Sequence, residues 1–454
     1  MDVLHVIHQF APETRGGSES YVLDVALAQR DRGLAVGVLT GSMAAWPQVG
    51  VEKLEVEGLP VWRLHRDDFF FDHHAKLWHA GVDEAYGRLL RELRPKLVHV
   101  HHWVRLSCHL VQQAEALGIP TVVTLHDQYT SCPRAFRMRA DDPACSRVLG
   151  GASCGPCVPK YGHETEGELA LGVELFAASL RAELSAARAV LVGVDTTADL
   201  LSRFSSVPRA RYTTLPLGYR PRWPGLPRLA APAPGESMRL AYWGGVGRHK
   251  GLGVLVDAVR MLHDDATLRS RFAVHVLGGF ESAAFESELR ERAAGLPVTF
   301  HGAFTPAQLR ALAPHVGVFP STCMETWGIV LDECAELGLP AVVSNLGALP
   351  GRVEPRGANA WGLVSEGGNA SSLAHQLRRM VSEAGLWERL QQAVPAATFG
   401  LDHHVEALQG VYHRASLAGP MGFAPPVPLA ERLRFLRVQQ DSAHTRLLPP
   451  GGPR

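Results

Sequence analysis

Two glutamates, Glu325 and Glu333, stand eight positions apart in the stretch METWGIVLDE, which follows an apolar segment ending at Pro320. With about 1.5 Å of rise per helical residue, Glu333 would lie on the order of 10 Å from the start of the helix that this stretch predicts. Carboxylate oxygens accept hydrogen bonds from hydroxyl groups, so the spacing suits the two ends of an extended ligand. The alternative is a pair of ordinary solvated glutamates.

The residues between these glutamates predict a place for negative charge. A helix over Ile329–Leu337 would direct the amides of Thr326, Trp327 and Gly328 toward the same space. Free amides at a helix N-terminus attract anions.

A second group of candidate residues is the glycine-rich turn WGGVGRHKG at 243–251, which contains Arg248 and Lys250. Lys250 is not followed by Ser or Thr, so the turn is not a P-loop. The third glycine of the dinucleotide fingerprint is also absent, which disfavours NAD. The turn therefore predicts an anionic ligand held by Lys and Arg, and the alternative is an exposed basic turn.

Two features of the first half complete the set. Gly16 and Gly17 directly precede a helical pattern, where glycines let the backbone approach a ligand closely. The alternative for them is a plain tight turn. His126 follows an apolar run that ends at Leu125, and the ordinary interpretation of any one histidine is a satisfied core or surface group.

The elements that must position these residues alternate between short apolar runs and amphipathic stretches, which predicts parallel sheets wrapped by helices. The expected helices include 21–32, 84–93, 254–262, 308–312 and 329–337. The expected strands are 3–8, 35–40, 61–65, 97–102, 121–125, 189–194, 239–243, 272–277, 298–301, 316–320 and 341–344.

The domain organisation follows from one interruption of this alternation. Prolines at 221, 224, 227, 232 and 234 predict a semi-rigid linker over 219–237. The expected domains are an N-terminal Rossmann-like domain over 1–218, with a Cys-rich insertion at 130–165, and a C-terminal domain over 238–396. A crossover helix over 397–418 would return to the N-terminal domain, and a Pro/Arg-rich tail with a short helix at 429–438 would occupy 419–454. Ligands of such doubly wound domains bind beyond the carboxyl ends of the strands, which here predicts a cleft between the two domains.

The composition of the chain limits the classes of partner and the cellular location that we expect. The 454 residues carry 45 Lys+Arg and 45 Asp+Glu, a net charge of 0, which disfavours nucleic acid as the main partner. No apolar run approaches the roughly 18 residues of a membrane span, and the N-terminus does not look like an export signal. The expected location is cytoplasmic. The run Phe69–Phe71 leaves open a peripheral contact at the inner face of the membrane.

Taken together, these motifs resemble the retaining glycosyltransferase family 4, the "glycosyl transferases group 1" with the GT-B fold, which includes sucrose-phosphate synthases and bacterial mannosyltransferases. The resemblance covers roughly residues 1 to 415. The Glu-x7-Glu element is its most specific part, supported by Gly16-Gly17, His126, the Lys250-Gly251 turn and the strand–Pro–Ser run before Glu325.

The resemblance implies a role for each residue. The C-terminal domain would bind a UDP- or GDP-linked sugar, with Glu325 on sugar hydroxyls and Glu333 on ribose hydroxyls. The diphosphate would meet Gly17 from the opposite domain, and His126 would contact the sugar near its reacting carbon. The donor-binding set is Gly16, Gly17, Arg248, Lys250, Glu325, Thr326, Trp327, Gly328, Ile329 and Glu333, and the catalytic set is His126, Glu325 and Lys250.

The implied reaction moves the sugar to a hydroxyl of a carbohydrate or lipid-linked acceptor with retention, as in polysaccharide or glycoconjugate biosynthesis. No catalytic metal is expected. One departure is that the family places an arginine five residues before the lysine, where this chain has Gly245. Arg248 is the candidate substitute. The alternatives are a GT-B sugar-nucleotide epimerase and an inactive relative that only binds nucleotide sugars.

Four of the seven cysteines crowd into the predicted insertion. Cys132, Cys145, Cys154 and Cys157 follow C-x12-C-x8-C-x2-C. Four thiolates with one C-x-x-C pair predict a structural zinc site, and the alternative is reduced, unliganded cysteines.

Overall fold

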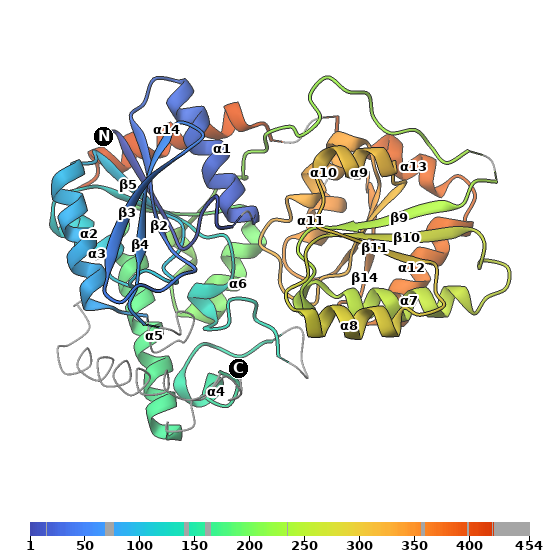
Figure 1. The fold of residues 1–454 in the computed structure, drawn as a ribbon, viewed down its shortest axis with the longest axis horizontal. Coiled ribbons are helices and arrows are strands. Elements are labelled where there is room, and N and C mark those ends of the chain that lie inside the picture. Colours follow the sequence, from blue (N-terminus) through green and yellow to red (C-terminus); the bar gives the residue numbers. More distant parts are fainter. Residues whose placement is uncertain are drawn as a thin grey trace. The chain divides into compact units, whose positions relative to one another are not determined.

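The computed structural model describes residues 1–14, 16–68, 77–139, 145–158, 165–233, 235–355, 359–396, 399–419 and 421. These residues form two compact units (Figure 1). The first unit contains the described residues of 1–135, 146–218 and 401–421. The second unit contains those of 219–400 together with 136–139 and Cys145. The run Phe69–Phe71 and the helix expected at 429–438 lie outside the described residues.

The described part of the first unit is built on an eight-stranded sheet with the order β3-β4-β2-β1-β5-β6-β7-β8. Every pair of neighbouring strands is parallel except β3 and β4. The strands are β1 (Val3–Ile7), β2 (Val36–Gly41), β3 (Gly50–Val56), β4 (Leu59–His65), β5 (Leu97–Val100), β6 (Thr121–Thr124), β7 (Ala189–Val192) and β8 (Tyr212–Thr214).

The sequence analysis missed β3 and β8 in this sheet. β3 is an antiparallel edge strand whose residues, GVEKLEV, are mostly exposed or half-buried. Its charged alternation differs from the continuous apolar runs of strands covered on both faces. β8 has three residues, which is too short for a pattern to emerge.

The helices of the first unit form two layers. One layer contains α1 and α14, which pack against each other although they come from opposite ends of the chain; α2, α3 and α5 pack together in the other (Figure 1). The helices are α1 (Gly17–Asp31), α2 (Ala80–Leu93), α3 (Leu110–Ala116), α4 (Gly151–Cys154), α5 (Glu166–Ala186), α6 (Asp195–Ser205) and α14 (Leu401–Leu417).

Alternate side chains of β1 and β5 point toward different layers of helices. Leu4, Val6, Val98 and Val100 join the apolar core that includes residues of α2, α3 and α5. The intervening residues point to the opposite face, because side chains alternate along a strand. His5 is one of them, and its ring contacts Gln29 of α1. The face toward α1 and α14 therefore contains buried polar side chains beside apolar ones.

The described part of the second unit is built on a six-stranded parallel sheet with the order β11-β10-β9-β12-β13-β14. Its strands are β9 (Met238–Trp243), β10 (Phe272–Leu277), β11 (Val298–Gly302), β12 (Val316–Phe319), β13 (Ala341–Ser344) and β14 (Gly362–Ser365). Its helices are α7 (Leu252–His263), α8 (Ala283–Arg292), α9 (Pro306–Leu312), α10 (Val330–Leu337), α11 (Leu349–Val353), α12 (Ala370–Ser382) and α13 (Leu386–Ala393).

Both units are doubly wound α/β structures, which confirms the predicted fold class. Each has its own apolar core. Within the described residues, no helix is both long enough and apolar enough to cross a membrane.

Candidate active site

The turn that carries Lys250 lies against the end of a neighbouring strand. β9 pairs with β12, so the segments that follow these two strands emerge side by side. Gly251 has φ +74, and a Cβ at this position would lie 1.9 Å from the carbonyl oxygen of Pro320. The amide of Thr322 also donates to the carbonyl oxygen of His249 at 2.9 Å. Only glycine allows this close approach, and it brings Lys250 next to the loop of Glu325.

The backbone of Glu325 is held by the loop that follows β13. The amide of Ala348 donates to the carbonyl oxygen of Glu325 at 2.7 Å. Gly347 has φ +68, and a Cβ there would lie 2.1 Å from the same oxygen. Three successive loops of the sheet, after β9, β12 and β13, are therefore locked together around Glu325.

The side chains of Lys250 and Glu325 meet at the centre of this arrangement. Lys250 Nζ lies 2.7 Å from Glu325 Oε1, which also accepts a hydrogen bond from Ser321 Oγ at 2.8 Å. The two side chains are 28% and 17% exposed. Burial alone would lower the pKa of Lys250, but the Glu325 carboxylate raises it above its usual value. Conversely, burial would raise the pKa of Glu325, but Lys250 lowers it. Both groups are charged at neutral pH.

Glu333 lies in the first turn of α10 and differs from Glu325 in its charge state. Trp243 Nε1 donates to Glu333 Oε2 at 2.6 Å. Burial nevertheless raises the pKa of Glu333 to about 7, because the hydrogen bond from Trp243 and the charge of Arg222 lower it only in part.

The segment between the two glutamates leaves backbone donors available. Within the described residues, the amides of Trp327, Gly328 and Ile329 donate to no backbone carbonyl, and no side chain caps the helix at Ile329. The neighbouring Thr326 side chain is buried. These amides precede α10, whose N-terminus adds partial positive charge.

The Trp327 side chain belongs to a cluster of contacts at the start of α10. Its Nε1 donates to Asp332 Oδ2 at 2.8 Å, and the guanidinium of Arg352 lies 3.9 Å from the ring centroid. Arg352 also pairs with Asp332 at 2.6 Å and donates to the carbonyl oxygen of Gly328 at 2.9 Å. This cluster holds the entrance of α10 in place.

The structure places Arg248 on a different partner from Lys250. Its guanidinium lies 2.5 Å from Glu288 Oε2 and 4.5 Å from the ring centroid of Phe285, both on α8. The side chain is 57% exposed. A Cβ at Gly245, where the family has arginine, would meet no atom within 4 Å. The role of Arg248 as the substitute cation stays a prediction.

In the first unit, Gly16 and Gly17 lie at the start of α1 as expected from the sequence. Both are exposed, Gly16 is the N-cap residue and Gly17 begins the helix. A Cβ at Gly16 would lie 2.5 Å from Glu19 Oε2. The loop before them is fixed by a buried arginine of β4, because Arg63 donates to the carbonyl oxygen of Ala11 at 3.1 Å.

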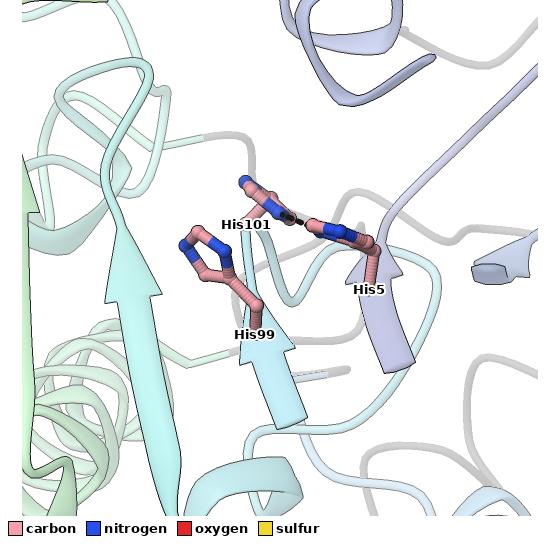
Figure 2. Close-up of side chains that lie close together, drawn as sticks. All are labelled: His5, His99 and His101. Atoms are coloured by element: carbon pink, nitrogen blue, oxygen red, sulfur yellow. Dashed lines mark hydrogen bonds between the residues drawn. The ribbon is translucent and has the colours of Figure 1, made fainter. Parts of the chain in front are cut away.

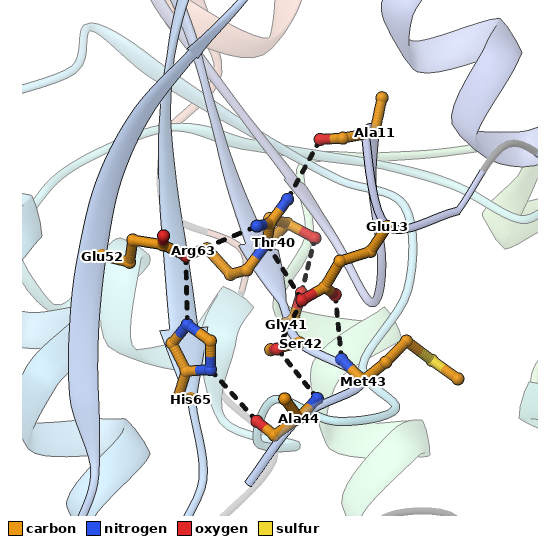
Figure 3. Close-up of polar contacts among 10 residues, drawn as sticks. All are labelled: Ala11, Glu13, Thr40, Gly41, Ser42, Met43, Ala44, Glu52, Arg63 and His65. Atoms are coloured by element: carbon orange, nitrogen blue, oxygen red, sulfur yellow. Dashed lines mark hydrogen bonds and ion pairs between the residues drawn. The ribbon is translucent and has the colours of Figure 1, made fainter. Parts of the chain in front are cut away.

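Figure 3 shows the rest of this anchoring network. Glu13 lies 3.6 Å from Arg63 and accepts hydrogen bonds from Ser42 Oγ and the amide of Met43, each at 2.9 Å. Glu52 of β3 contacts Arg63 from the other side at 3.4 Å. The loops after β1 and β2 are thus tied to each other and to the strands β3 and β4.

His126 follows β6, and its ring is fixed by other aromatic groups. His126 Nε2 lies 3.0 Å from His101 Nδ1, and the Tyr21 ring is 4.9 Å away, centroid to centroid. Burial lowers the pKa of His126 to about 4, so the ring is neutral at pH 7. The sequence analysis singled out His126 alone and did not connect it with His99 and His101. Their signal was visible as histidine at alternate positions of an apolar strand.

The rings of His5, His99 and His101 are close enough to bind a metal ion, since one nitrogen of each lies within 4.8 Å of the others (Figure 2). All six ring nitrogens, however, already have hydrogen-bond partners at 2.7–3.0 Å. The partners outside the trio are Gln29, Tyr412, Thr124 and His126. Hydrogen bonding alone accounts for this cluster.

The cysteines expected to bind zinc belong to different units, with Cys145 in the second and Cys132, Cys154 and Cys157 in the first. Within the described residues, no three of these sulfurs lie within 4.8 Å of one another. Each is a free thiol in the structure. The zinc site stays a prediction.

Comparisons with known proteins agree with the geometry. Residues 16–218 match the model of the glycosyl transferase 4-like domain, and residues 237–383 match that of the glycosyl transferases group 1. The D-inositol 3-phosphate glycosyltransferase of Nocardiopsis dassonvillei is 27% identical over 426 residues, which cover 87% of this chain and 89% of the relative. The protein of the same name from Streptomyces bingchenggensis is 28% identical over 395 residues, covering 84% and 77%.

Solved structures show the same fold. Sucrose-phosphate synthase from Thermosynechococcus elongatus has a TM-score of 0.62 at 18% identity, covering 91% of this chain and 99% of the other. HepE from Anabaena, solved in complex with UDP and glucose, has a TM-score of 0.60 at 14% identity, with the same coverage. The chain has the GT-B fold and belongs to the glycosyl transferases group 1, the glycosyltransferase family 4.

Proposed function

We propose that this glycosyltransferase moves a sugar from a nucleoside-diphosphate donor to a hydroxyl group of its acceptor, with retention of the anomeric configuration. The contact between Lys250 Nζ and Glu325 Oε1 carries the proposal. In this contact a cation and a carboxylate lie side by side, two residues before the amides of Trp327–Ile329, which donate to no backbone carbonyl in the described residues.

The roles follow from the charges that develop in the reaction. Glycosyl transfer passes through an oxocarbenium-like state while negative charge grows on the departing diphosphate. Lys250 and the amides before α10 are proposed to stabilise that charge. Because Glu325 holds Lys250 in position before the donor arrives, little reorganisation is needed during the reaction.

The remaining contacts are assigned by the same chemistry. Glu325 accepts hydrogen bonds from hydroxyls of the donor sugar, and Glu333 accepts them from the ribose. Arg248, Gly16 and Gly17 are proposed to contact the diphosphate, and His126 the sugar near its reacting carbon. The charge is neutralised by side chains and amides, so the proposal needs no catalytic metal.

The names of the relatives suggest the acceptor. Proteins called D-inositol 3-phosphate glycosyltransferases align with most of this chain. We therefore propose a phosphorylated polyol as the first acceptor to examine, with other carbohydrate hydroxyls and lipid-linked acceptors after it. The neighbour solved with UDP and glucose makes UDP-glucose the first donor.

The test is nucleotide release from a panel of UDP- and GDP-sugars, with inositol 3-phosphate and related polyols as acceptors, in the presence and absence of EDTA. We expect acceptor-dependent release with one donor, unchanged by EDTA. Glu325→Gln and Lys250→Met should lower kcat by about 10²–10³-fold, the usual cost of removing a group that stabilises developing charge. Glu383→Gln is the matched control, because Glu383 is also paired with arginines in the second unit.

Other outcomes would contradict the proposal. Interconversion of donors without nucleotide release would indicate an epimerase, and donor binding without turnover would indicate an inactive relative. Inversion of the anomeric configuration in the product, observed by NMR, would contradict retention.

A further inference from the structure

An exposed tryptophan lies on the loop between β2 and β3. Trp46 is 39% exposed, although its indole is stacked on the buried ring of His65 of β4. The two ring centroids are 3.9 Å apart, and the ring planes are within 6° of parallel. One face of the indole is therefore covered by His65, and much of the remaining aromatic surface is accessible to a ligand.

Contacts on both sides hold the two rings in place. Figure 3 shows that His65 lies between Ala44 and Glu52: its Nδ1 is 3.0 Å from the carbonyl oxygen of Ala44, and its Nε2 is 3.3 Å from Glu52 Oε2. The amide of Trp46 donates to the carbonyl oxygen of Arg66 at 2.8 Å. The backbone of Trp46 is thus fixed next to the end of β4, and the imidazole against its indole cannot turn without losing two contacts.

A glycine at the start of β3 makes room for the indole. Gly50 is paired with His65 in the antiparallel ladder, so a side chain at position 50 would point to the same face of the sheet as the imidazole. A Cβ there would lie 2.7 Å from Cε3 and Cζ3 of Trp46. The indole occupies this space instead. Because its position is fixed by the fold, a ligand that packs on it does not have to order it first.

The loop that carries Trp46 is tied to the loop before α1. Glu13 accepts hydrogen bonds from Ser42 Oγ and the amide of Met43, each at 2.9 Å, and the amide of Ala44 donates to Ser42 Oγ at 3.0 Å. The two loops follow the parallel strands β1 and β2, so both lie at the carboxyl edge of the sheet. Trp46 is therefore at the edge where doubly wound domains bind their ligands.

Along this edge, Trp46 is displaced from the point where the strand order reverses. That point lies between β1 and β5, and it is where ligands of doubly wound sheets bind. His65, on which Trp46 is stacked, ends β4, which is two strands from β1. With about 4.8 Å between neighbouring strands, the indole lies roughly 10 Å from β1. This separation is longer than one sugar ring.

We propose that Trp46 is a platform on which a carbohydrate ring of the acceptor stacks, and that this ring is not the one whose hydroxyl group receives the sugar. The inference rests on the proposed function and adds to it an acceptor of at least two rings. Sugar rings have C–H groups on their faces and hydroxyl groups around their rims. The C–H groups pack on the electron-rich face of the indole. The half-exposed carboxylate of Glu52, next to His65, accepts hydrogen bonds from the hydroxyl groups.

The surroundings of Trp46 favour a carbohydrate over a membrane or a protein. Glu13 and Glu52 lie 3.6 and 3.4 Å from the same arginine, Arg63, so two carboxylates share one guanidinium. This acidic setting disfavours the anionic surface of a membrane. The large apolar side chains exposed on the loop are those of Met43 and Trp46, whereas a stable protein interface involves about 20 residues or more on each side.

The test is fluorine NMR of the unliganded protein labelled with 5-fluorotryptophan. The chain has nine tryptophans, and the Trp46 signal is the one that is lost in Trp46→Phe. The probes are the methyl glycosides of glucose, galactose and mannose and of the disaccharides maltose, lactose and mannobiose. We expect at least one of them to shift the Trp46 signal with saturation.

Two results of this titration would overturn the proposal. One is a Trp46 signal that none of the glycosides shifts. The other is a shift caused by vesicles of phosphatidylglycerol and by no glycoside, which would assign the exposed indole to contact with a membrane.

Kinetics with one-ring and two-ring acceptors examine the distance of Trp46 from the reacting hydroxyl. Trp46→Ala should raise the KM for a two-ring acceptor about tenfold with little change in kcat, and leave the KM for a one-ring acceptor and for the donor unchanged. Trp46→Phe keeps an aromatic face and should recover part of the loss. Leu117→Ala is the matched control, because Leu117 is 42% exposed in the same unit but lies just before β6, at the amino edge of the sheet.

Equal losses with both kinds of acceptor would overturn the proposal, because they would show that Trp46 acts on the fold or on the reacting ring. If Trp46→Ala does not fold, the fluorine titration of the wild type still decides. If the wild type transfers no sugar to any acceptor, the proposed function fails, whereas the titration still shows whether Trp46 binds a carbohydrate.

Discussion

The two units bury polar groups at the ends of their strands in opposite ways. In the first unit, neutral imidazoles, hydroxyls and one amide form buried hydrogen bonds from His126 through His5 and Tyr412 to Thr124. In the second unit, Lys250 and Glu325 form a charged pair. The neutral groups satisfy one another without any net charge, whereas the ion pair holds two opposite charges in place. The first arrangement suits the orientation of hydroxyls, and the second suits the stabilisation of a charged leaving group.

This difference predicts that acid destabilises the two units to different extents. The largest effect that we expect is a loss of stability of the first unit as the pH falls. Histidines whose pKa lies below the usual value bind no proton when folded, but they bind one when unfolded near pH 6.5. Stability is therefore complete above pH 6.5 and falls as the pH drops toward about 4. The first unit has more such residues, namely His5, His8, His79, His99, His101, His126 and His404, against His249, His275 and His315 in the second.

Each such histidine costs up to about 1.4 kcal/mol per pH unit in this window. Hydrogen exchange measured by mass spectrometry at pH 7 and pH 5.5, corrected for intrinsic rates, should show a much larger loss of protection in the first unit. The Lys250–Glu325 pair should persist, because the pKa of Glu325 is lowered. Equal losses in both units would contradict the comparison.

The next effect concerns the charged pair itself. Lys250→Met and Glu325→Gln each leave one charge unpaired in a half-buried site, and each should lower the free energy of unfolding by about 2 kcal/mol. The double variant should recover much of this stability and none of the activity. Urea denaturation of the wild type, the two single variants and the double variant provides a double-mutant cycle. Additive losses of the free energy of unfolding would show that the two charges do not interact.

A smaller effect that we expect is a pH dependence of nucleotide affinity that arises from Glu333 and not from Glu325. The pKa of Glu333 is about 7, so this carboxyl is largely protonated below pH 7 and then donates instead of accepting. Affinity for the nucleotide should rise as the pH increases from 6 to 8, by up to about tenfold. Calorimetry should show this slope in the wild type and in the exposed control Glu388→Gln. It should be absent in Glu333→Gln, and a slope that persists there would assign it to another group.

The smallest effect that we expect is an increase in affinity for the nucleotide. A side chain at Gly245 meets no neighbour within 4 Å of its Cβ, so Gly245→Arg should fold normally and place a cation where the family has one. We expect UDP to bind a few times more tightly, while Gly245→Ala should bind as the wild type does. Weaker binding by Gly245→Arg would show that this turn has diverged from the family's arrangement.

The sequence predicted the fold class because buried parallel strands leave continuous apolar runs. Phe272–Leu277 and Ala341–Ser344 have the bounds expected for them. The edge strand β3 lacks that signal, and β14 (Gly362–Ser365), also missed, begins with glycine and has four residues. β13 also has four residues and was predicted, so the glycine at the start of β14, and not its length, separates these two strands.

At the candidate site, residue types and spacing pointed to Lys250 and Glu325 but not to what holds them. Gly347 is essential to the position of Glu325 through its left-handed backbone, yet nothing in its neighbours marks it as part of the site. The hydrogen-bond chain was beyond sequence reasoning for a different reason. Gln29 and Tyr412 are 383 residues apart, so their contact depends on the completed fold.

The same distance has a consequence for biosynthesis. α14 supplies His404 and Tyr412 to the interior of the first unit, and both residues are translated after the whole second unit. Until they leave the ribosome, Tyr21 and His99 lack the partners that satisfy them in the native state. Proteins usually fold their N-terminal domain first during synthesis. In this chain the N-terminal unit can finish its interior only after the second unit has been translated.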